Sequence, residues 1–186
     1  ERPSPFDADV KQDLDLLPLY KEVNNCFAWT QGAITTAGYF DWLSNLELEH
    51  RHTLPNGIRC LGVHASPGRD DGSGIHPKST QQELQTLVNG CDADIVFVGH
   101  THAPCDITVE GIRIVNLGSI SNPIPEDLRA SYVILESDRN SYKLSHHRVA
   151  YDYAAVIDQC NKINHPATRH ITELMLGQHQ PPWVRS

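Results

Sequence analysis

The sequence predicts a mixed α/β fold in which helices pack against a β-sheet. Two short apolar segments, residues 58–63 and 95–98, have the length and composition of buried strands. A segment with helical periodicity separates them, and two hairpin patterns follow. Strands and helices in this order favour a layered α/β architecture. The length of 186 residues fits one domain that spans residues 1–186.

Helices are expected at both ends of the chain. The first is expected to end at Gly32, because glycine is common where helices stop. Thr35 or Thr36 can cap a second helix, since either hydroxyl can accept a hydrogen bond from a free backbone N–H. Two more helices, near residues 152–163 and 168–175, close the chain.

The central elements carry clear local signals. Thr80 and Glu83 have the spacing of a capping box, in which each side chain accepts a hydrogen bond from the other residue's backbone, so they open a helix. Residues 107–114 alternate apolar side chains on both sides of a glycine turn, which predicts a hairpin. Residues 132–135 and 142–149 are predicted to pair as a second hairpin.

The composition excludes several classes of function. The chain holds 15 Lys and Arg residues against 23 Asp and Glu residues, a formal net charge of −8, so it lacks the basic surface of a duplex-binding protein. No apolar run approaches the roughly 18 residues that a membrane span needs. The five cysteines are odd in number and form no C-x-x-C pair, which is typical of reduced intracellular thiols. We therefore expect a cytoplasmic protein.

Both predicted buried strands end in histidine. His64 follows the first strand, and His100 and His102 follow the second. Ligands bind at the carboxyl ends of strands in open α/β sheets, and in an extended backbone His100 and His102 point to the same side. If the two strands are neighbours, the three imidazoles converge and favour a metal site. A lone histidine at a strand end, by contrast, is more often a hydrogen-bonded turn residue.

Seven of the eight histidines outside these strand ends are predicted to be solvated, because they lie in charged, hairpin or helical segments. They are His50, His52, His146, His147, His165, His170 and His179.

A hydrolytic centre that uses divalent ions also needs carboxylate oxygens. Asp70 and Asp71 lie in the loop after His64 and could reach the site, whereas Asp94 opens its strand at the far end and is expected to point away. Cys105 is either a fourth soft ligand or, more in keeping with its type, a small buried residue. The sequence therefore predicts the imidazole part of a site without an evident acidic part.

Three motifs in fixed order resemble the calcineurin-like metallophosphoesterases, and most closely their small bacterial and archaeal phosphodiesterase branch. They are His64-Ala-Ser-Pro67, Val98-Gly-His-Thr-His102 and Asn116-Leu-Gly-Ser119. The resemblance covers most of the chain and implies a layered α/β/β/α sandwich. It also implies a hydrolase that acts on a small phosphorylated substrate, a phosphomonoester or phosphodiester.

The resemblance implies a site with two divalent ions, Mn²⁺, Fe²⁺ or Fe³⁺, Zn²⁺ or Ni²⁺. His64 and His100 would bind the second ion and His102 the first. A hydroxide held between the ions would attack phosphorus in line with the leaving group. Neither the catalytic acid nor the residues that bind the substrate are identified by the sequence.

The chain departs from the family pattern in its first part. The family's Asp-x-His, Gly-Asp and Gly-Asn-His-Asp motifs, which carry the carboxylate ligands, are absent, and residue 1 is Glu rather than Met. We expect that an N-terminal segment with the first strands is missing, and that the isolated chain has weak or no hydrolytic activity. The alternative is a non-catalytic scaffold or binding module, the way retromer-type adaptors use this fold.

Two other His-x-His folds fit less well. A cupin has a Glu three or four residues after this motif, and the first Glu after His102 is Glu110. A histidine-triad hydrolase needs a third alternate histidine, and Pro104 occupies that position. Arg69 and Lys78, in the polar loop after His64, could meet an anionic substrate, although a solvated loop is the simpler interpretation.

Overall fold

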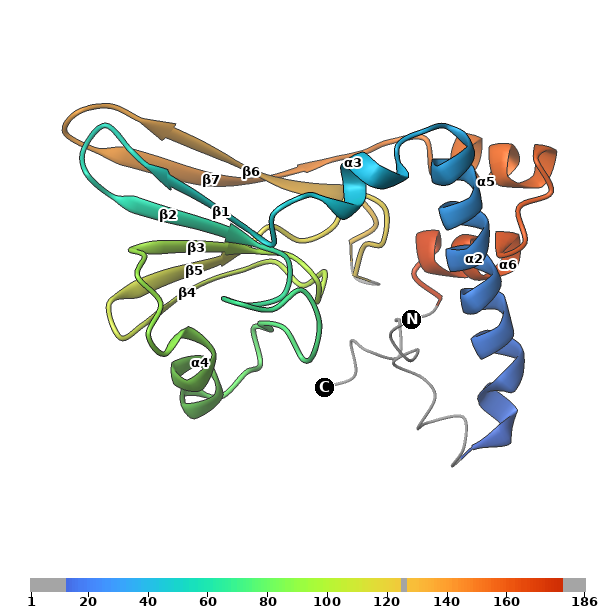
Figure 1. Ribbon diagram of the computed structural model, residues 1–186, viewed down its shortest axis with the longest axis horizontal. Coiled ribbons are helices and arrows are strands. Elements are labelled where there is room, and N and C mark those ends of the chain that lie inside the picture. Colours follow the sequence, from blue (N-terminus) through green and yellow to red (C-terminus); the bar gives the residue numbers. More distant parts are fainter. Residues whose placement is uncertain (1–12, 125–126, 179–186) are drawn as a thin grey trace. The chain divides into compact units, whose positions relative to one another are not determined.

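The computed structural model describes residues 13–124 and 127–178, and His179 lies outside them (Figure 1). The described chain forms two compact units, which are considered separately. One is helical and combines the segment up to Leu46 with residues 152–178. The other contains the sheets and spans Glu47–Tyr151.

The sheet unit is built on one five-stranded mixed sheet with the strand order β1-β2-β3-β5-β4. Strands β2, β3 and β5 are parallel neighbours, and the two outer strands run antiparallel to them. The strands are β1 (Glu49–Thr53), β2 (Arg59–Val63), β3 (Ile95–Val98), β4 (Cys105–Val109) and β5 (Ile112–Asn116). The predicted neighbourhood of the two histidine-bearing strands is confirmed, because β2 pairs directly with β3.

Each face of this sheet is covered by a different layer. Helix α4 (Gln81–Val88) packs on one face, and the hairpin of β6 (Ala130–Ser137) and β7 (Tyr142–Val149) packs on the other. Side chains alternate along β3, so Val96 joins the cluster with α4 and Ile95 joins the cluster with the hairpin. The predicted α/β class is confirmed, with three layers in this unit.

Most central elements begin and end close to their predicted positions. The capping box of Thr80 and Glu83 opens α4, and both of its reciprocal hydrogen bonds are present. Leu84 and Val88 are buried on the inner face of this helix, as its periodicity predicts. The two predicted hairpins are the pairs β4–β5 and β6–β7.

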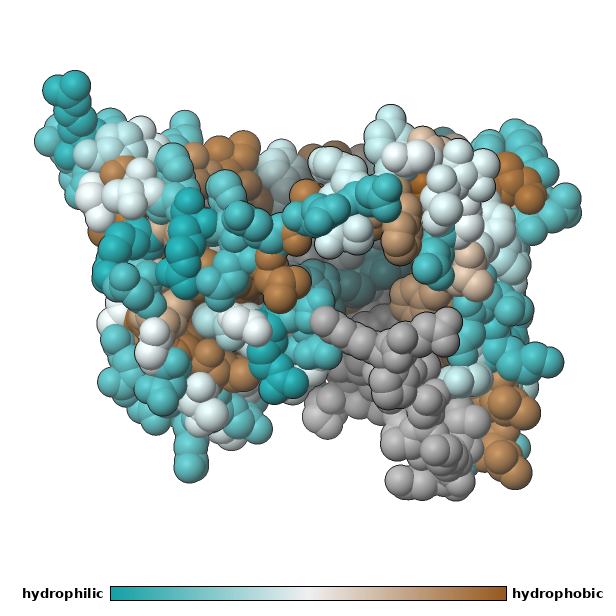
Figure 2. Space-filling model, viewed as in Figure 1, coloured by the Kyte–Doolittle hydropathy of each residue, from teal (hydrophilic) through white to brown (hydrophobic). Residues whose placement is uncertain are grey.

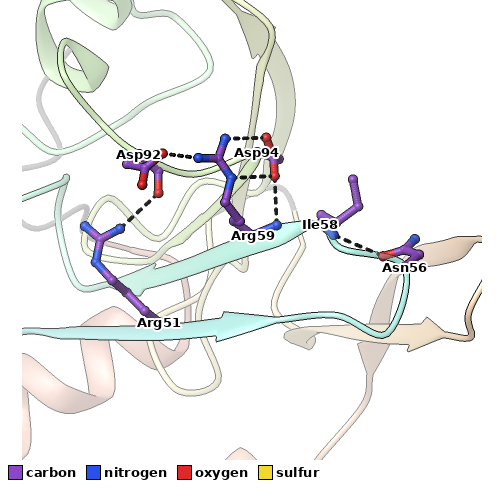
Figure 3. Close-up of polar contacts among 6 residues, drawn as sticks. All are labelled: Arg51, Asn56, Ile58, Arg59, Asp92 and Asp94. Carbon is purple, nitrogen blue, oxygen red and sulfur yellow. Dashed lines mark hydrogen bonds and ion pairs between the residues drawn. The ribbon is translucent and has the colours of Figure 1, made fainter.

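Strand β1 was not predicted, because its sequence Glu-His-Arg-His-Thr contains no apolar residue. It is an edge strand that pairs antiparallel with β2, and His50 and His52 on it are exposed, as expected of solvated histidines. A turn at Pro55-Asn56-Gly57 joins the two strands, and the backbone N–H of Ile58 donates to the Asn56 side chain (Figure 3).

An ion-pair network ties β2 to the start of β3, at the end of the sheet opposite the histidines. Arg59 donates to both oxygens of the Asp94 carboxylate and also pairs with Asp92 (Figure 3). Arg51 of β1 donates to the backbone carbonyl of Asp92. Asp94 therefore points away from the histidine end of the sheet, as the sequence predicts.

The helical unit contains η1 (Leu14–Leu16), α2 (Leu17–Thr36), α3 (Phe40–Ser44), α5 (Tyr153–Lys162) and α6 (Thr168–Met175). The last two were predicted within one or two residues. Figure 2 shows hydrophobic side chains on the surface at the lower end of α2, where Leu14 and Leu17 are exposed.

The predicted boundary at Gly32 is wrong, because α2 continues through this residue to Thr36. A glycine inside a helix costs only about 1 kcal/mol, which the surrounding residues can offset. The helix stops at Gly38, whose φ of 78° is the left-handed conformation that ends many helices. Thr35 does not cap α3, since its hydroxyl donates to the Gln31 carbonyl inside α2.

Within the described ranges, no helix is both long enough and apolar enough to cross a membrane. All five cysteines are free thiols in the structure.

Candidate metal centre

The ends of β2 and β3 bring His64 and His100 into contact. The Nε2 atom of His64 and the Nδ1 atom of His100 are 3.3 Å apart. The two rings meet edge to face, with 5.1 Å between their centroids. Because the strands are parallel neighbours, their carboxyl ends lie at one edge of the sheet, which is the physical reason for this convergence.

The backbone that carries His100 and His102 is not extended, contrary to the expectation from the sequence. Strand β3 ends at Val98, and His100 and His102 have φ values of 59° and 58°, both left-handed. The N–H of Thr101 donates to the Gly99 carbonyl at 2.7 Å, which closes a three-residue turn around His100. The prediction that strand alternation orients the two histidines is therefore wrong, because both residues follow the strand.

A backbone carbonyl fixes the orientation of the His100 ring. Its Nε2 atom is 2.8 Å from the carbonyl oxygen of Gly72. Because a carbonyl oxygen only accepts, Nε2 carries the proton, and in the neutral ring the lone pair lies on Nδ1, the atom that faces His64. Metal-binding histidines usually donate their second ring N–H to a carbonyl or carboxylate in this way.

The spacing of the two ring nitrogens suits a shared metal ion. Two nitrogens that each lie about 2.1 Å from a tetrahedral zinc ion are about 3.4 Å apart. The distance of 3.3 Å between His64 and His100 is close to this value. The distance between the two nitrogens is therefore compatible with one shared ion.

His102 is the third histidine at this edge, and its Nδ1 atom is buried without a hydrogen-bond partner. Burial, together with the positive charge that His100 and His64 could carry, lowers the pKa of His102. Burial also lowers the pKa of His64, with His100 acting in the same direction and Asp70 opposing it. Both effects favour the neutral imidazole, which is the form that binds metals.

The arrangement is nevertheless incomplete as a metal cage. Within residues 13–124 and 127–178, no group of three or more His, Cys, Asp or Glu side chains is arranged to hold an ion. What the structure places together is a histidine pair, with His102 and Asp70 within electrostatic range of His64.

Other candidate ligands have different roles. Asp71 lies 3.6 Å from the Arg69 guanidinium, an exposed ion pair in the loop after His64. Cys105 lies on β4, and burial raises the pKa of its thiol, which disfavours the thiolate that binds metals. It therefore fits the small, partly buried residue that its type suggested.

The prediction that the remaining histidines are solvated is wrong for His165 and His170. Both are buried in the helical unit, with exposed fractions of 9% and 6%. The ring of His165 meets Trp29 edge to face, and its Nδ1 accepts from the Ala167 N–H. An imidazole that finds such partners can be buried, which local sequence does not reveal.

Asn116 is a site residue to which the sequence analysis gave no role beyond its place in a motif. It ends β5 and is completely buried. Its side-chain nitrogen lies 2.8 Å from the Gly99 carbonyl and 2.9 Å from the Thr101 hydroxyl. A polar residue that ends a buried apolar strand was the signal that could have identified it.

The fold matches two solved structures over most of the chain. A hypothetical protein from Pyrococcus horikoshii OT3 superposes with a TM-score of 0.67 and 20% identity, covering 80% of this chain and 57% of that one. A metallophosphoesterase from Sphaerobacter thermophilus superposes with a TM-score of 0.62 and 25% identity, covering 76% of this chain and 62% of that one. The chain thus spans about three fifths of the length of these relatives.

Comparison with curated proteins found no match. The family model of the calcineurin-like phosphoesterase superfamily domain matches residues 33–140, which is more than half of the chain. This range contains β1 to β6 and all three histidines of the candidate centre. The chain belongs to the calcineurin-like phosphoesterase superfamily.

Proposed function

We propose that this chain supplies the imidazole ligands of a metal-dependent phosphoester hydrolase. The observation that carries the proposal is the pair of ring nitrogens of His64 and His100, 3.3 Å apart, with the second nitrogen of His100 held by the Gly72 carbonyl. Members of the family usually bind divalent metal ions. Such ions would neutralise the charge that develops on the phosphoryl oxygens during hydrolysis.

The chain's own residues hold and orient these ions in the proposal. His64 and His100 would share one ion, since their facing nitrogens have the separation of two ligands. His102, with its buried and unpartnered Nδ1, would serve a second ion. The substrate would be a small phosphomonoester or phosphodiester.

The carboxylate ligands are the missing part of the proposal. The motifs Asp-x-His, Gly-Asp and Gly-Asn do not occur in the 186 residues. Three imidazoles without a bridging carboxylate bind two hard divalent ions weakly. We therefore expect this chain to bind metal but to hydrolyse phosphodiesters weakly or not at all.

Retention of metal by variants tests the ligand assignment. The chain is dialysed to equilibrium against buffer that contains Zn²⁺ or Mn²⁺, and the bound metal is measured by mass spectrometry. His64→Ala and His100→Ala are expected to reduce binding at least tenfold. His52→Ala, an exposed histidine on β1 at the opposite end of the sheet, is the matched control and should bind as the parent does.

The outcomes distinguish the hydrolase from a binding module. A parent chain that retains no more metal than His64→Ala contradicts the proposal and favours a non-catalytic scaffold. The same samples are assayed with bis(p-nitrophenyl) phosphate. Rapid hydrolysis by the chain with two bound ions would show that the expectation of weak hydrolysis is wrong. The chain would then complete its ligand set with residues outside the absent carboxylate motifs.

A further inference from the structure

The turn around His100 is strained, and its strain requires support from neighbouring residues. The Thr101 N–H donates to the Gly99 carbonyl, and His100 between them has a positive φ. This combination defines the rare form of the γ-turn. This conformation is unfavourable for any residue that has a Cβ atom, and therefore for histidine. Strained backbone of this kind persists only where the surroundings determine it, and it is common at functional sites.

Asn116 supplies part of this support. Its side-chain nitrogen donates to the Gly99 carbonyl, the same oxygen that closes the turn, at 2.8 Å. It also donates to the Thr101 hydroxyl at 2.9 Å, on the other side of His100. Its side-chain oxygen accepts from the Gly118 N–H at 2.9 Å. Only this orientation of the carboxamide satisfies both its nitrogen and its oxygen, because a flipped group would place N–H against N–H.

Thr101 completes the network. Its hydroxyl donates to the Ile75 carbonyl at 2.9 Å while it accepts from Asn116. Thr101 is 2% exposed and Asn116 is 0% exposed, so loss of either partner leaves buried polar groups unsatisfied. The network connects β5, the turn at His100 and the segment before α4.

We propose that Asn116 and Thr101 are positioning residues that hold His100 in its metal-binding geometry. This inference rests on the proposed function, because it assigns the network to the metal ligand that the turn carries. Neither residue touches the metal or the substrate in this account. Loss of such outer contacts typically weakens metal binding by 10- to 100-fold.

Three variants separate positioning from ordinary stability. Thr101→Val has nearly the same shape but lacks the hydroxyl, whereas Thr101→Ser keeps it. Ile114→Val is the control, because it removes one buried methyl group from β5, two residues before Asn116, on the face packed by α4. Thermal unfolding of each variant establishes how much stability each change costs.

The first readout is titration with Co²⁺, followed by visible absorption. Thr101→Val is expected to weaken Co²⁺ binding at least tenfold, while Thr101→Ser and Ile114→Val stay within about threefold of the parent. Parental affinity in Thr101→Val overturns the inference. An equal loss in Ile114→Val at matched stability also overturns it, because the effect would then follow stability alone.

The second readout needs no metal. Amide hydrogen exchange over residues 99–103 is expected to accelerate at least tenfold in Thr101→Val and not in Ile114→Val. Asn116→Ser provides a second variant should Thr101→Val fold poorly, with the same expectation. A parent that binds no Co²⁺ overturns the proposed function, whereas unchanged exchange in both Thr101→Val and Asn116→Ser overturns the positioning role specifically.

Discussion

The strand-end histidines could be predicted from the sequence, but their geometry could not. His64 and His100 were identified because a parallel pair of strands brings its carboxyl ends together, which is a property of the fold class. The left-handed turn at His100 and its contact with Gly72 depend on residues 28 positions apart in the chain. Such contacts produce no periodic pattern in the neighbouring residues, so they cannot be predicted from one sequence.

Gly74 offers a residue-scale test of how tightly the site is built. Its φ is 62°, and a Cβ atom there would lie 2.8 Å from the His100 ring and 2.9 Å from the Thr101 methyl group. We expect Gly74→Ala to destabilise the protein by about 2–3 kcal/mol, from left-handed strain together with this overlap. Urea unfolding measures the change.

The matched control is Gly90→Ala. Gly90 has a similar φ of 74°, but no atom lies within 4 Å of its added Cβ. This variant should lose only the strain of the left-handed backbone, about 1 kcal/mol. Equal losses in the two variants would mean that the packing around Gly74 does not constrain His100.

The secondary-structure elements divide according to how local their signals are. The capping box of Thr80 and Glu83 lies within one turn of chain, and α4 begins where it predicts. Strand β1 has no apolar residue and is held by backbone pairing with β2, so no pattern of hydrophobicity could reveal it. The predicted helix end at Gly32 was wrong because helix α2 tolerates a glycine in its interior.

The ion pair between Arg59 and Asp94 gives an element-scale prediction on pH. Hydrogen bonds from the Arg59 side chain and backbone lower the pKa of the Asp94 carboxyl from 3.8 to about 2. The stability that the pair contributes is therefore fully present above about pH 4 and disappears as the pH falls through about 2. The effect is small, because both side chains are exposed.

Comparison of the parent with Asp94→Asn checks this sign. The parent should have the higher urea midpoint at pH 7, and the difference should shrink steadily between pH 4 and pH 2. A difference that grows as the pH falls would show that the ionised carboxylate does not stabilise the junction of β2 and β3.

At the scale of the molecule, the sequence sufficed for the class of fold and the family. Short buried strands, one intervening helix and two hairpins predicted the layered sheet unit, and the motifs around His64 and His100 identified the superfamily that the family model confirms. The burial of His165 and His170 was not predictable, since it depends on packing among helices that are distant in the chain.

In the proposed centre, His64 and His100 share a divalent metal ion. Diffraction from crystals of the chain grown with Zn²⁺, recorded at the zinc absorption edge, tests it most directly. We expect an anomalous peak about 2.1 Å from both His64 Nε2 and His100 Nδ1. Well-ordered histidine rings without a peak between them, or zinc bound only at other histidines, would contradict it.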